Sequence, residues 1–506
     1  MRGLSFRLLY RLLIAVFLAA WAAIGLRQSE KHLPPGVHIT GDWRALGAHD
    51  VHFLRDLAAA DATGAPLTER QINTELLHMI GQARELLVLD TGLFGDLPAA
   101  GPGAARLRAA APVAASVTDA LLQARQQQPD LRILMLIDPA SVRLQPDAAT
   151  LQRLRQAGIA VVPVNAGRLR APDAAFLALF QLCCRWWNPP LASGSWPNPL
   201  GVGPSSISFG LWGRIRGYQR AHRQLLIGDD GAGGLTGLIF SRPLNAEASL
   251  HSAVALQLSG DALAPLLESE FVVAQFSGWT GGGAMQERAQ RLVERQNANA
   301  APLKAVDSAR ARVVSEEGIA DVLVQRLASV GRHDSVDLAA LYLSDRDVVR
   351  AVVDAATRGA TVRVLLDPGK DGYGYSRSGV PNRQVGSELV AASDGAARVR
   401  WYRTHGEQFS PGLVMVRSDG RCWLLVGTAE LTRSDVDDFN LAAAFVADLP
   451  AGAPAATDAQ SWFDTLWGNR AAGGVEYSAD VDVYADASQV DYWKYRVLEA
   501  SGASFD

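Results

Sequence analysis

Short apolar runs alternate with longer amphipathic segments along most of this chain. The apolar runs predict buried strands, and the amphipathic segments predict helices that pack against them. The predicted strands lie at 86–90, 133–139, 159–164, 336–343, 362–368 and 399–402. A predicted helix precedes each strand, at 68–83, 113–128, 148–157, 316–328, 345–358 and 382–392. This alternation is typical of α/β units whose strands are largely buried.

The same order of elements occurs twice, which indicates an internal duplication. The second strand of each set ends in the same dipeptide, Asp138-Pro139 in the first half and Asp367-Pro368 in the second. A stretch rich in Gly and Ala at 278–302 lies near the centre of the body and predicts a linker between the halves. We therefore expect four parts: 1–30, 31–277, 278–302 and 303–506.

The N-terminus carries a predicted membrane segment. Arg2, Arg7 and Arg11 precede the uncharged residues 12–26, which span about 22 Å as a helix and fall short of a ~30 Å hydrocarbon core. An uncleaved anchor lengthened by residues 8–10 is the favoured interpretation, and a signal peptide cleaved near residues 20–22 is the alternative. The basic flank places the N-terminus in the cytoplasm and the body outside it.

Composition excludes several classes of protein. The 506 residues are 48% hydrophobic and 20% charged, which excludes a largely disordered chain. The net charge is -4 and no long basic run occurs, so nucleic acid is disfavoured as a partner. The three cysteines, Cys183, Cys184 and Cys422, predict neither a disulfide framework nor a zinc site. We expect no metal and no cofactor.

Aromatic residues gather in the segment 172–198. They are Phe176, Phe180, Trp186, Trp187 and Trp196. A buried helix and loop is the favoured interpretation, because large aromatic side chains are mostly buried. The alternative is a lid or a membrane-contacting surface, because tryptophan favours the lipid interface.

The segment 221–241 contains His222, Gln224 and Asp229, and it resembles the phospholipase D superfamily. The mark of that superfamily is His-x-Lys-x4-Asp, once in each half. Further segments are similar to one bacterial, membrane-anchored branch, at 53–57, 88–96, 365–374, 381–384, 400–409 and 437–441. The resemblance implies two similar α/β domains, each a mixed β-sheet flanked by helices, related by pseudo-twofold symmetry. It also implies that the body faces the periplasm at the cytoplasmic membrane.

The resemblance implies a chemistry as well. One histidine attacks phosphorus and forms a phosphohistidine, while the histidine of the other half protonates the leaving oxygen. The two lysines hold the phosphoryl oxygens and stabilise the charge that develops on them. No metal takes part, and the acid of each motif supports its half of the architecture or the state of its histidine.

The first half keeps part of this motif. His222 and Asp229 stand at their places, but Gln224 replaces the lysine. Arg223 does not replace it easily, because an adjacent residue on a strand faces the other way. The amides that usually follow are missing too, since Pro243 stands in place of one asparagine and Ala253, after His251, in place of another.

The second half departs further. Aligned on residues 404–409, the His-x-Lys positions fall at Ser410 and Gly412, and the acid position falls at Arg417. Glu430 stands where an amide would approach the phosphate. Lys370, in a loop after Asp367-Pro368, matches a loop of the family and could reach a phosphate.

Two interpretations of function compete. The first is a membrane-anchored phospholipase D-like protein with impaired catalysis that binds a phosphoryl headgroup or a protein partner. The second is an active phosphodiesterase or transphosphatidylase that uses His222 with an unusual acid, His405 or Glu407. The missing lysines favour the first, because removing members of a catalytic unit costs orders of magnitude in rate. A nuclease is disfavoured by the charge and the membrane segment.

Overall fold

Two large sheets form the body in the computed structural model. It describes residues 6–60, 66–96, 111–144, 149–200, 203–216, 219–299, 308–372, 375–470, 475–486 and 488–502. In these residues the first sheet has eight strands, in the order β3-β2-β11-β10-β9-β4-β5-β6. They are β2 (Val51–Ala60), β3 (Pro66–Arg70), β4 (Leu86–Thr91), β5 (Arg132–Ile137), β6 (Ala160–Pro163), β9 (Leu225–Asp229), β10 (Leu235–Phe240) and β11 (Ala253–Ser259).

The second sheet has nine strands within the described residues, in the order β1-β12-β20-β19-β18-β13-β14-β17-β21. They are β1 (Arg44–Gly47), β12 (Ser308–Ser315), β13 (Ser335–Ala340), β14 (Thr361–Leu366), β17 (Ala397–Tyr402), β18 (Leu413–Ser418), β19 (Arg421–Gly427), β20 (Ala443–Pro450) and β21 (Ser478–Asp480). The predicted strands are therefore present in both halves, shifted by a few residues at their ends.

The two sheets repeat one topology. The strands β2, β4, β5, β6, β9, β10 and β11 correspond in chain order and in sheet position to β12, β13, β14, β17, β18, β19 and β20. Three strands of each set are parallel, and the rest are antiparallel. This confirms the predicted fold class, two similar mixed sheets related by a pseudo-twofold axis. The edges of the two sheets differ, because the second sheet is extended by β1, a strand that comes from the first half of the chain and pairs with β12.

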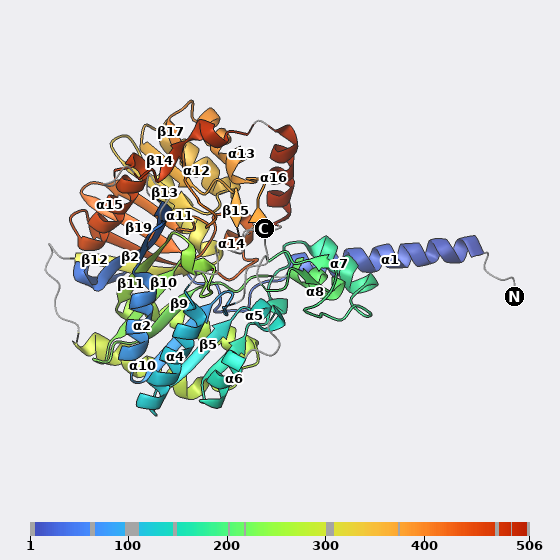
Figure 1. Cartoon of the computed structure of the whole chain (residues 1–506), viewed down its shortest axis with the longest axis horizontal. Helices are drawn as coiled ribbons and strands as arrows, with labels where there is room; N and C mark the ends of the chain where they lie inside the picture. The colour runs from blue at the N-terminus through green and yellow to red at the C-terminus, as the bar shows by residue number, and fades with distance from the viewer. Residues whose placement is uncertain are drawn as a thin grey trace.

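Helices cover the outer face of each sheet (Figure 1). On the first half they are α2 (Ile72–Gln82), α4 (Val113–Gln127) and α6 (Ala149–Gln156), and on the second half they are α11 (Glu317–Ala328), α12 (Arg346–Thr357), α13 (Asn382–Ala392) and α16 (Gln489–Ser501). Three other helices, α9 (Ala264–Phe276), α10 (Gly282–Asn299) and α15 (Pro454–Gly468), pack against the apolar core on the inner side of the sheets. The short helix α5 (Pro139–Leu144) follows β5, and the short helix α14 (Arg433–Val436) lies between β19 and β20.

Two predicted elements differ from the structure. The helix expected at 68–83 begins at Ile72, because residues 66–70 pair with β2 as strand β3. The predicted linker is helical over Gly282–Asn299, because Met285, Ala289 and Leu292 pack into the core beside α9. Residues 300–302 of that linker lie outside the described residues.

The inner faces of the two sheets share one apolar core. Val88 and Ile227 of the first half pack in the same cluster as Met415 and Phe445 of the second. Backbone bridges cross the seam in two related places, between Ala221 and Leu441 and between Ser252 and Phe409. The halves are thus joined both by apolar packing and by main-chain hydrogen bonds.

An insertion between β6 and β9 breaks the symmetry. It contains α7 (Ala174–Cys183), β7 (Trp196–Pro197), β8 (Ser206–Ile207) and α8 (Phe209–Arg216). The corresponding connection in the second half, between β17 and β18, has only residues 403–412. A disulfide joins Cys183 to Cys184 after α7, which the cysteine pattern did not predict.

The helix α1 (Phe6–Ser29) projects from this insertion (Figure 1). Its 24 residues span about 36 Å at 1.5 Å per residue, longer than a ~30 Å hydrocarbon core. Among the described residues it is the one helix long and apolar enough to cross a membrane. The buried interpretation of the aromatic segment is correct for Phe180, but Trp186 and Trp187 are 82% and 73% exposed.

A buried arginine links the halves beside the seam. Arg223 is fully buried, and its guanidinium donates to both carboxylate oxygens of Glu316, at 3.0 Å each, and to Glu270 at 2.9 Å. It also donates to the Val37 carbonyl at 2.8 Å. Burial raises the pKa of Glu316 to about 7, although the charge of Arg223 opposes this. Arg223 therefore points away from the side of the missing motif lysine, as the sequence predicted, and into the buried interior of the protein.

Replacing this arginine should destabilise the fold strongly. We expect Arg223→Met to lower the free energy of unfolding by about 3–5 kcal/mol, because two carboxylates stay buried without a cation. The loss should shrink as the pH falls, since a protonated Glu316 needs no cation. Denaturant unfolding of the full chain in detergent measures it. Arg153→Met, which breaks an exposed ion pair with Asp119, should cost about 1 kcal/mol or less. Equal losses in the two variants would contradict this role.

Candidate functional site

The positions of the two degenerate motifs meet in one cavity. A cavity of about 120 Å³ lies at the seam, and its lining includes His222, Gln224, Ser410, Gly412 and Glu430. Each half contributes to it, as the sequence alignment predicted. His222 lies three residues before β9, and Ser410 lies three residues before β18. The two therefore occupy corresponding places in the duplicated fold.

The duplicated Asp-Pro dipeptides place these two segments. Asp138 Oδ2 accepts a hydrogen bond of 2.9 Å from the backbone N–H of Ala221, the residue before His222. Asp367 Oδ2 accepts one of 2.8 Å from the N–H of Phe409, the residue before Ser410. Burial raises the pKa of Asp367 to about 7. The repeat found in the sequence thus has a physical role, which is to position the start of each motif.

His222 pairs with a carboxylate of the other half. Its Nε2 lies 3.3 Å from Oδ1 of Asp435, a residue of α14. The same oxygen accepts a hydrogen bond of 2.6 Å from the side-chain amide of Asn440. Burial alone would lower the pKa of His222, but the charges of Asp435 and Glu430 and the hydrogen bond to Asp435 raise it overall. Asp435 was not identified as a site residue from the sequence, although it lies two residues before the matching segment 437–441.

Two polar groups in the cavity have no partner among the described residues. The side-chain oxygen of Gln224 and the hydroxyl of Ser410 are both buried and accept or donate no hydrogen bond there. Gln224 also has a φ of 47°, in the left-handed region that non-glycine residues rarely adopt. Buried polar groups are normally satisfied. These two therefore suit contact with a polar ligand.

The second lysine position is closed by the main chain. A Cβ atom on Gly412 would lie 2.1 Å from the carbonyl oxygen of Gly427, which belongs to the neighbouring strand. The Gly427 N–H also donates 2.9 Å to the Gly412 carbonyl. A lysine at position 412 would force these two segments apart, so substitution at this position alone cannot restore the motif.

Comparison with known proteins supports the fold described above. Residues 323–467 match the family model described as "Cardiolipin synthase, PLD-like domain". Phosphatidylserine synthase from Haemophilus influenzae Rd KW20 is similar over 96% of both chains, at 11% identity and a TM-score of 0.52. The chain has a phospholipase D-like fold.

A second solved structure covers a smaller share of the chain. Nuc, a phospholipase D family member from Salmonella typhimurium, aligns over 34% of this chain and 97% of its own, at 15% identity and a TM-score of 0.25. No curated protein matches the chain in sequence.

Two arginines of this phospholipase D-like fold line the cavity and were not found from the sequence. Arg220 Nη1 lies 3.8 Å from Glu430, and Arg377 Nη1 donates 2.7 Å to the Tyr342 hydroxyl. Both bring positive charge to a cavity whose motif lysines are absent. Nothing in the sequence marked either arginine, because neither occupies a motif position and only the folding of distant segments brings them to the cavity.

Several predicted site residues lie outside the cavity lining. Lys370 donates 2.8 Å to the Thr404 carbonyl and lies 3.5 Å from Asp371, so it does not reach the cavity. His405 is 43% exposed and 3.6 Å from Glu407, and neither residue lines the cavity. The predicted alternative acids are therefore misplaced.

A different histidine is in the cavity. His251 lines it, is buried, and has its Nε2 3.1 Å from Glu247. In the sequence, His251 was recognised only as the residue that precedes Ser252 and Ala253, where the family usually has an asparagine. Its position directly before the bridge between Ser252 and Phe409 brings it to the seam.

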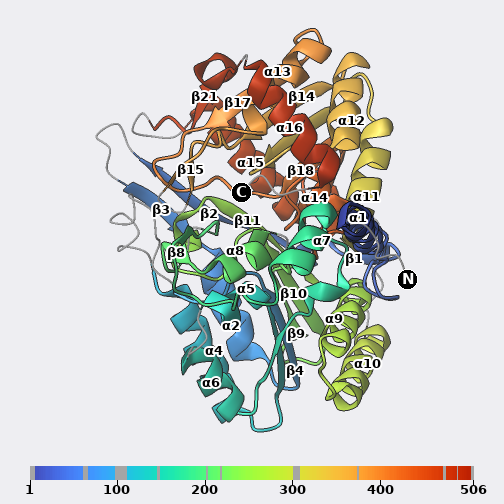
Figure 2. The same cartoon turned by 90° about the vertical axis from the view of Figure 1, so that its right-hand side faces the viewer.

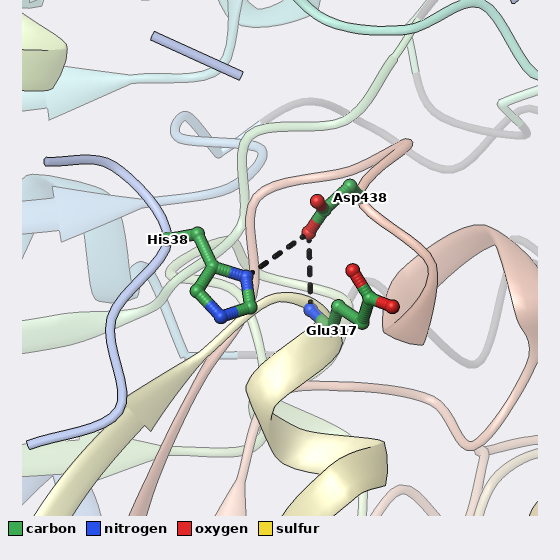
Figure 3. A group of neighbouring side chains, drawn as sticks. All are labelled: His38, Glu317 and Asp438. Carbon is green, nitrogen blue, oxygen red and sulfur yellow. Dashed lines mark hydrogen bonds and ion pairs between the residues drawn. The ribbon is translucent and has the colours of Figure 1, made fainter. Parts of the chain in front are cut away.

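A group that could hold a metal lies elsewhere. The ligand atoms of His38, Glu317 and Asp438 lie within 4.8 Å of one another (Figure 3). His38 Nδ1 lies 3.5 Å from Asp438 Oδ1, which also accepts 3.1 Å from the backbone N–H of Glu317. None of the three lines the cavity. Contacts within the group account for its arrangement.

Asp229 has a structural role. This carboxylate is buried and does not line the cavity, which fits the architectural role, one of the two that the resemblance implied for the acid of the motif. It accepts hydrogen bonds from the backbone N–H groups of Arg84, Glu85, Leu86 and Gly231, at 2.7 to 3.1 Å. Arg417, at the corresponding place, instead pairs with Asp337 at 3.2 Å.

Loss of the Asp229 carboxylate should destabilise the first half. We expect Asp229→Ala to lower the free energy of unfolding by about 3 kcal/mol, because several backbone N–H groups lose their acceptor. Denaturant unfolding of the full chain measures this change. The neighbouring variant Asp230→Ala removes an exposed carboxylate that bonds only Ala232 and Gly234, and should cost much less. An unchanged stability in Asp229→Ala would contradict the structural role.

Proposed function

We propose that this chain is a membrane-anchored phospholipase D-like protein that binds a phosphoryl headgroup in the seam cavity and turns over phosphodiesters barely above background. The observation that carries the proposal is Gly412, since the main chain occupies the place of a motif lysine. Gln224 and Ser410 supply neutral groups where the family has a lysine and a histidine. The loss of catalytic groups is thus built into the packing of the site.

The remaining groups suit binding better than catalysis. Against the effect of burial, the charges of Asp435 and Glu430 raise the pKa of His222 and so favour its protonated form, and an imidazolium has no lone pair with which to attack phosphorus. The Ser410 hydroxyl is no practical acid at neutral pH. The positive charges of His222, Arg220 and Arg377 favour an anionic phosphoryl group, and the Ser410 hydroxyl can donate to one of its oxygens.

The helix α1 supports membrane anchoring. It is 24 residues long, apolar and preceded by basic residues, and its first 14 residues are exposed in the protein. We propose that it crosses the bacterial cytoplasmic membrane with the body in the periplasm, following the bias of positive charge toward the cytoplasm.

A working phosphodiesterase is the second candidate function. The presence of two histidines, His222 and His251, in one cavity favours it, because the family's chemistry uses a pair. His251 would then be the acid that protonates the leaving oxygen, in place of His405.

The full chain in detergent should show almost no turnover. We expect bis(p-nitrophenyl) phosphate and phosphatidylglycerol to be hydrolysed barely above background, since loss of catalytic partners typically costs several orders of magnitude. His222→Ala should leave the measured rate unchanged. His333→Ala, which alters an exposed histidine, is the matched control. Robust turnover that His222→Ala abolishes and His333→Ala preserves would overturn the impaired interpretation and support the second candidate.

Binding of an anion should depend on the protonation of His222. Dimethyl phosphate keeps one charge over the neutral range, so its affinity reports the protein alone. The raised pKa of His222 means that binding is strong in acid and weakens as the pH rises through that pKa. Calorimetry of the full chain measures this. His222→Gln should remove the pH dependence and weaken binding in acid by about tenfold, which is ~1.4 kcal/mol.

Glu430→Gln is the opposite test of the same site. Removing this carboxylate should tighten the binding of dimethyl phosphate, because a negative charge in the cavity opposes the anion. A pH-independent affinity in the unmodified chain, or an unchanged affinity in both variants, would show that the anion does not bind at His222.

A further inference from the structure

Exposed apolar side chains gather in two places outside α1. One group belongs to the insertion between β6 and β9: Leu179, Trp186, Trp187, Leu191 and Trp196. The other belongs to α16: Val490, Trp493 and Val497. The α16 residues are three and four positions apart, so they share one face of the helix. Their exposure, 64–78%, is unusual for large apolar side chains.

Both groups lie on the side of the body from which α1 projects. In Figure 1 the insertion helices α7 and α8 lie at the base of α1, and α16 lies at the edge of the body on the same side. Figure 2, which looks at that side, shows α7, α8 and α16 around the end of α1. We call this side the α1 face, and it comprises α7, α8, the loop between them and α16.

Hydrogen bonds fix α1 to the insertion. Trp21 Nε1 donates 2.8 Å to the Ala175 carbonyl of α7, and the Ala171 N–H donates 3.1 Å to the Gln28 carbonyl. Lys31, just after α1, donates 2.8 Å to the Gly167 carbonyl. If α1 enters a bilayer, these contacts bring the insertion to the bilayer surface.

Arginines accompany the apolar residues of the insertion. Arg185 is exposed directly before Trp186, and burial together with the charges of Arg185 and Arg143 lowers the pKa of Arg214 in α8. Arg216 is exposed at the end of α8. Tryptophan at the interface combined with clustered arginine is the pattern of a surface that contacts anionic lipid.

We propose that the α1 face lies on the surface of a bilayer that contains anionic phospholipid, with Trp186, Trp187 and Trp493 at the headgroup level. The proposal rests on membrane anchoring by α1. The insertion also forms part of the cavity wall through Pro199 and Leu200, and Leu200 packs against the same apolar cluster as Trp212 of α8. The ligand of the cavity is accordingly the headgroup of a lipid in that bilayer.

Fluorescent probes in the full chain test the contact. An NBD label is attached to Trp187→Cys, to Trp493→Cys, or to Glu287→Cys as the control on α10, which lies on the far side of the body from α1 in Figure 1. The native cysteines do not interfere, because Cys183 and Cys184 are disulfide-bonded and Cys422 is buried. Each variant is reconstituted into phosphatidylcholine vesicles with or without phosphatidylglycerol, together with a nitroxide-labelled lipid as quencher.

We expect several-fold stronger quenching at positions 187 and 493 than at 287. Adding Arg185→Glu and Arg216→Glu should reduce the quenching at 187 only in vesicles that contain phosphatidylglycerol. Vesicle flotation separates the two proposals, since a chain that does not float lacks the anchor. A chain that floats with all three probes equally quenched would overturn the proposed surface. Energy transfer between probes at 187 in different copies, without lipid quenching, would assign the face to a second copy and overturn it too.

Discussion

The buried ion cluster of Arg223 constrains everything around the cavity. Its guanidinium is fully buried between Glu316 of the second half and Glu270 of α9, so the segment that carries it cannot turn over. Successive residues of an extended segment point to opposite sides. Burying Arg223 on one side therefore directs His222 toward the cavity on the other. The missing lysine at position 224 is not replaced by Arg223, because that charge is committed to holding the halves together.

The seam keeps the framework of the phospholipase D-like fold, while several residues at the motif positions differ from those of the family. Asp138 and Asp367 still hold the chain before each motif, and the paired bridges across the seam are intact. In contrast, the place of one lysine is closed by the Gly427 carbonyl. Retained geometry with altered chemistry fits a site that still has to hold a ligand in a defined place. The buried, unpartnered oxygens of Gln224 and Ser410 agree with this view.

Local patterns in the sequence predicted what local forces determine. Buried strands and the duplicated Asp-Pro endings follow from hydrophobic periodicity and spacing, whereas the correspondence of His222 with Ser410 was implied by the family resemblance. The partner of His222 could not be found in this way, because Asp435 reaches it only through the folding of the other half. The place of Arg377 in the cavity and the helix over Gly282–Asn299 were not predicted for the same reason, because tertiary packing determines both. The exposure of Trp186 departs from the favoured buried interpretation of its segment, because the average burial of tryptophan does not decide the burial of any one residue.

The departure from twofold symmetry makes the two sides of the cavity different. The connection from β6 to β9 holds two helices and the exposed tryptophans, whereas the matching connection from β17 to β18 spans residues 403–412. A symmetric pair of domains would present its cavity equally toward either half. Here one connection both fixes α1 and supplies Pro199 and Leu200 to the cavity wall. The same connection therefore places α1, the helix that is long and apolar enough to cross a membrane, beside the wall of the cavity, which is the arrangement that the proposed contact with lipid headgroups requires.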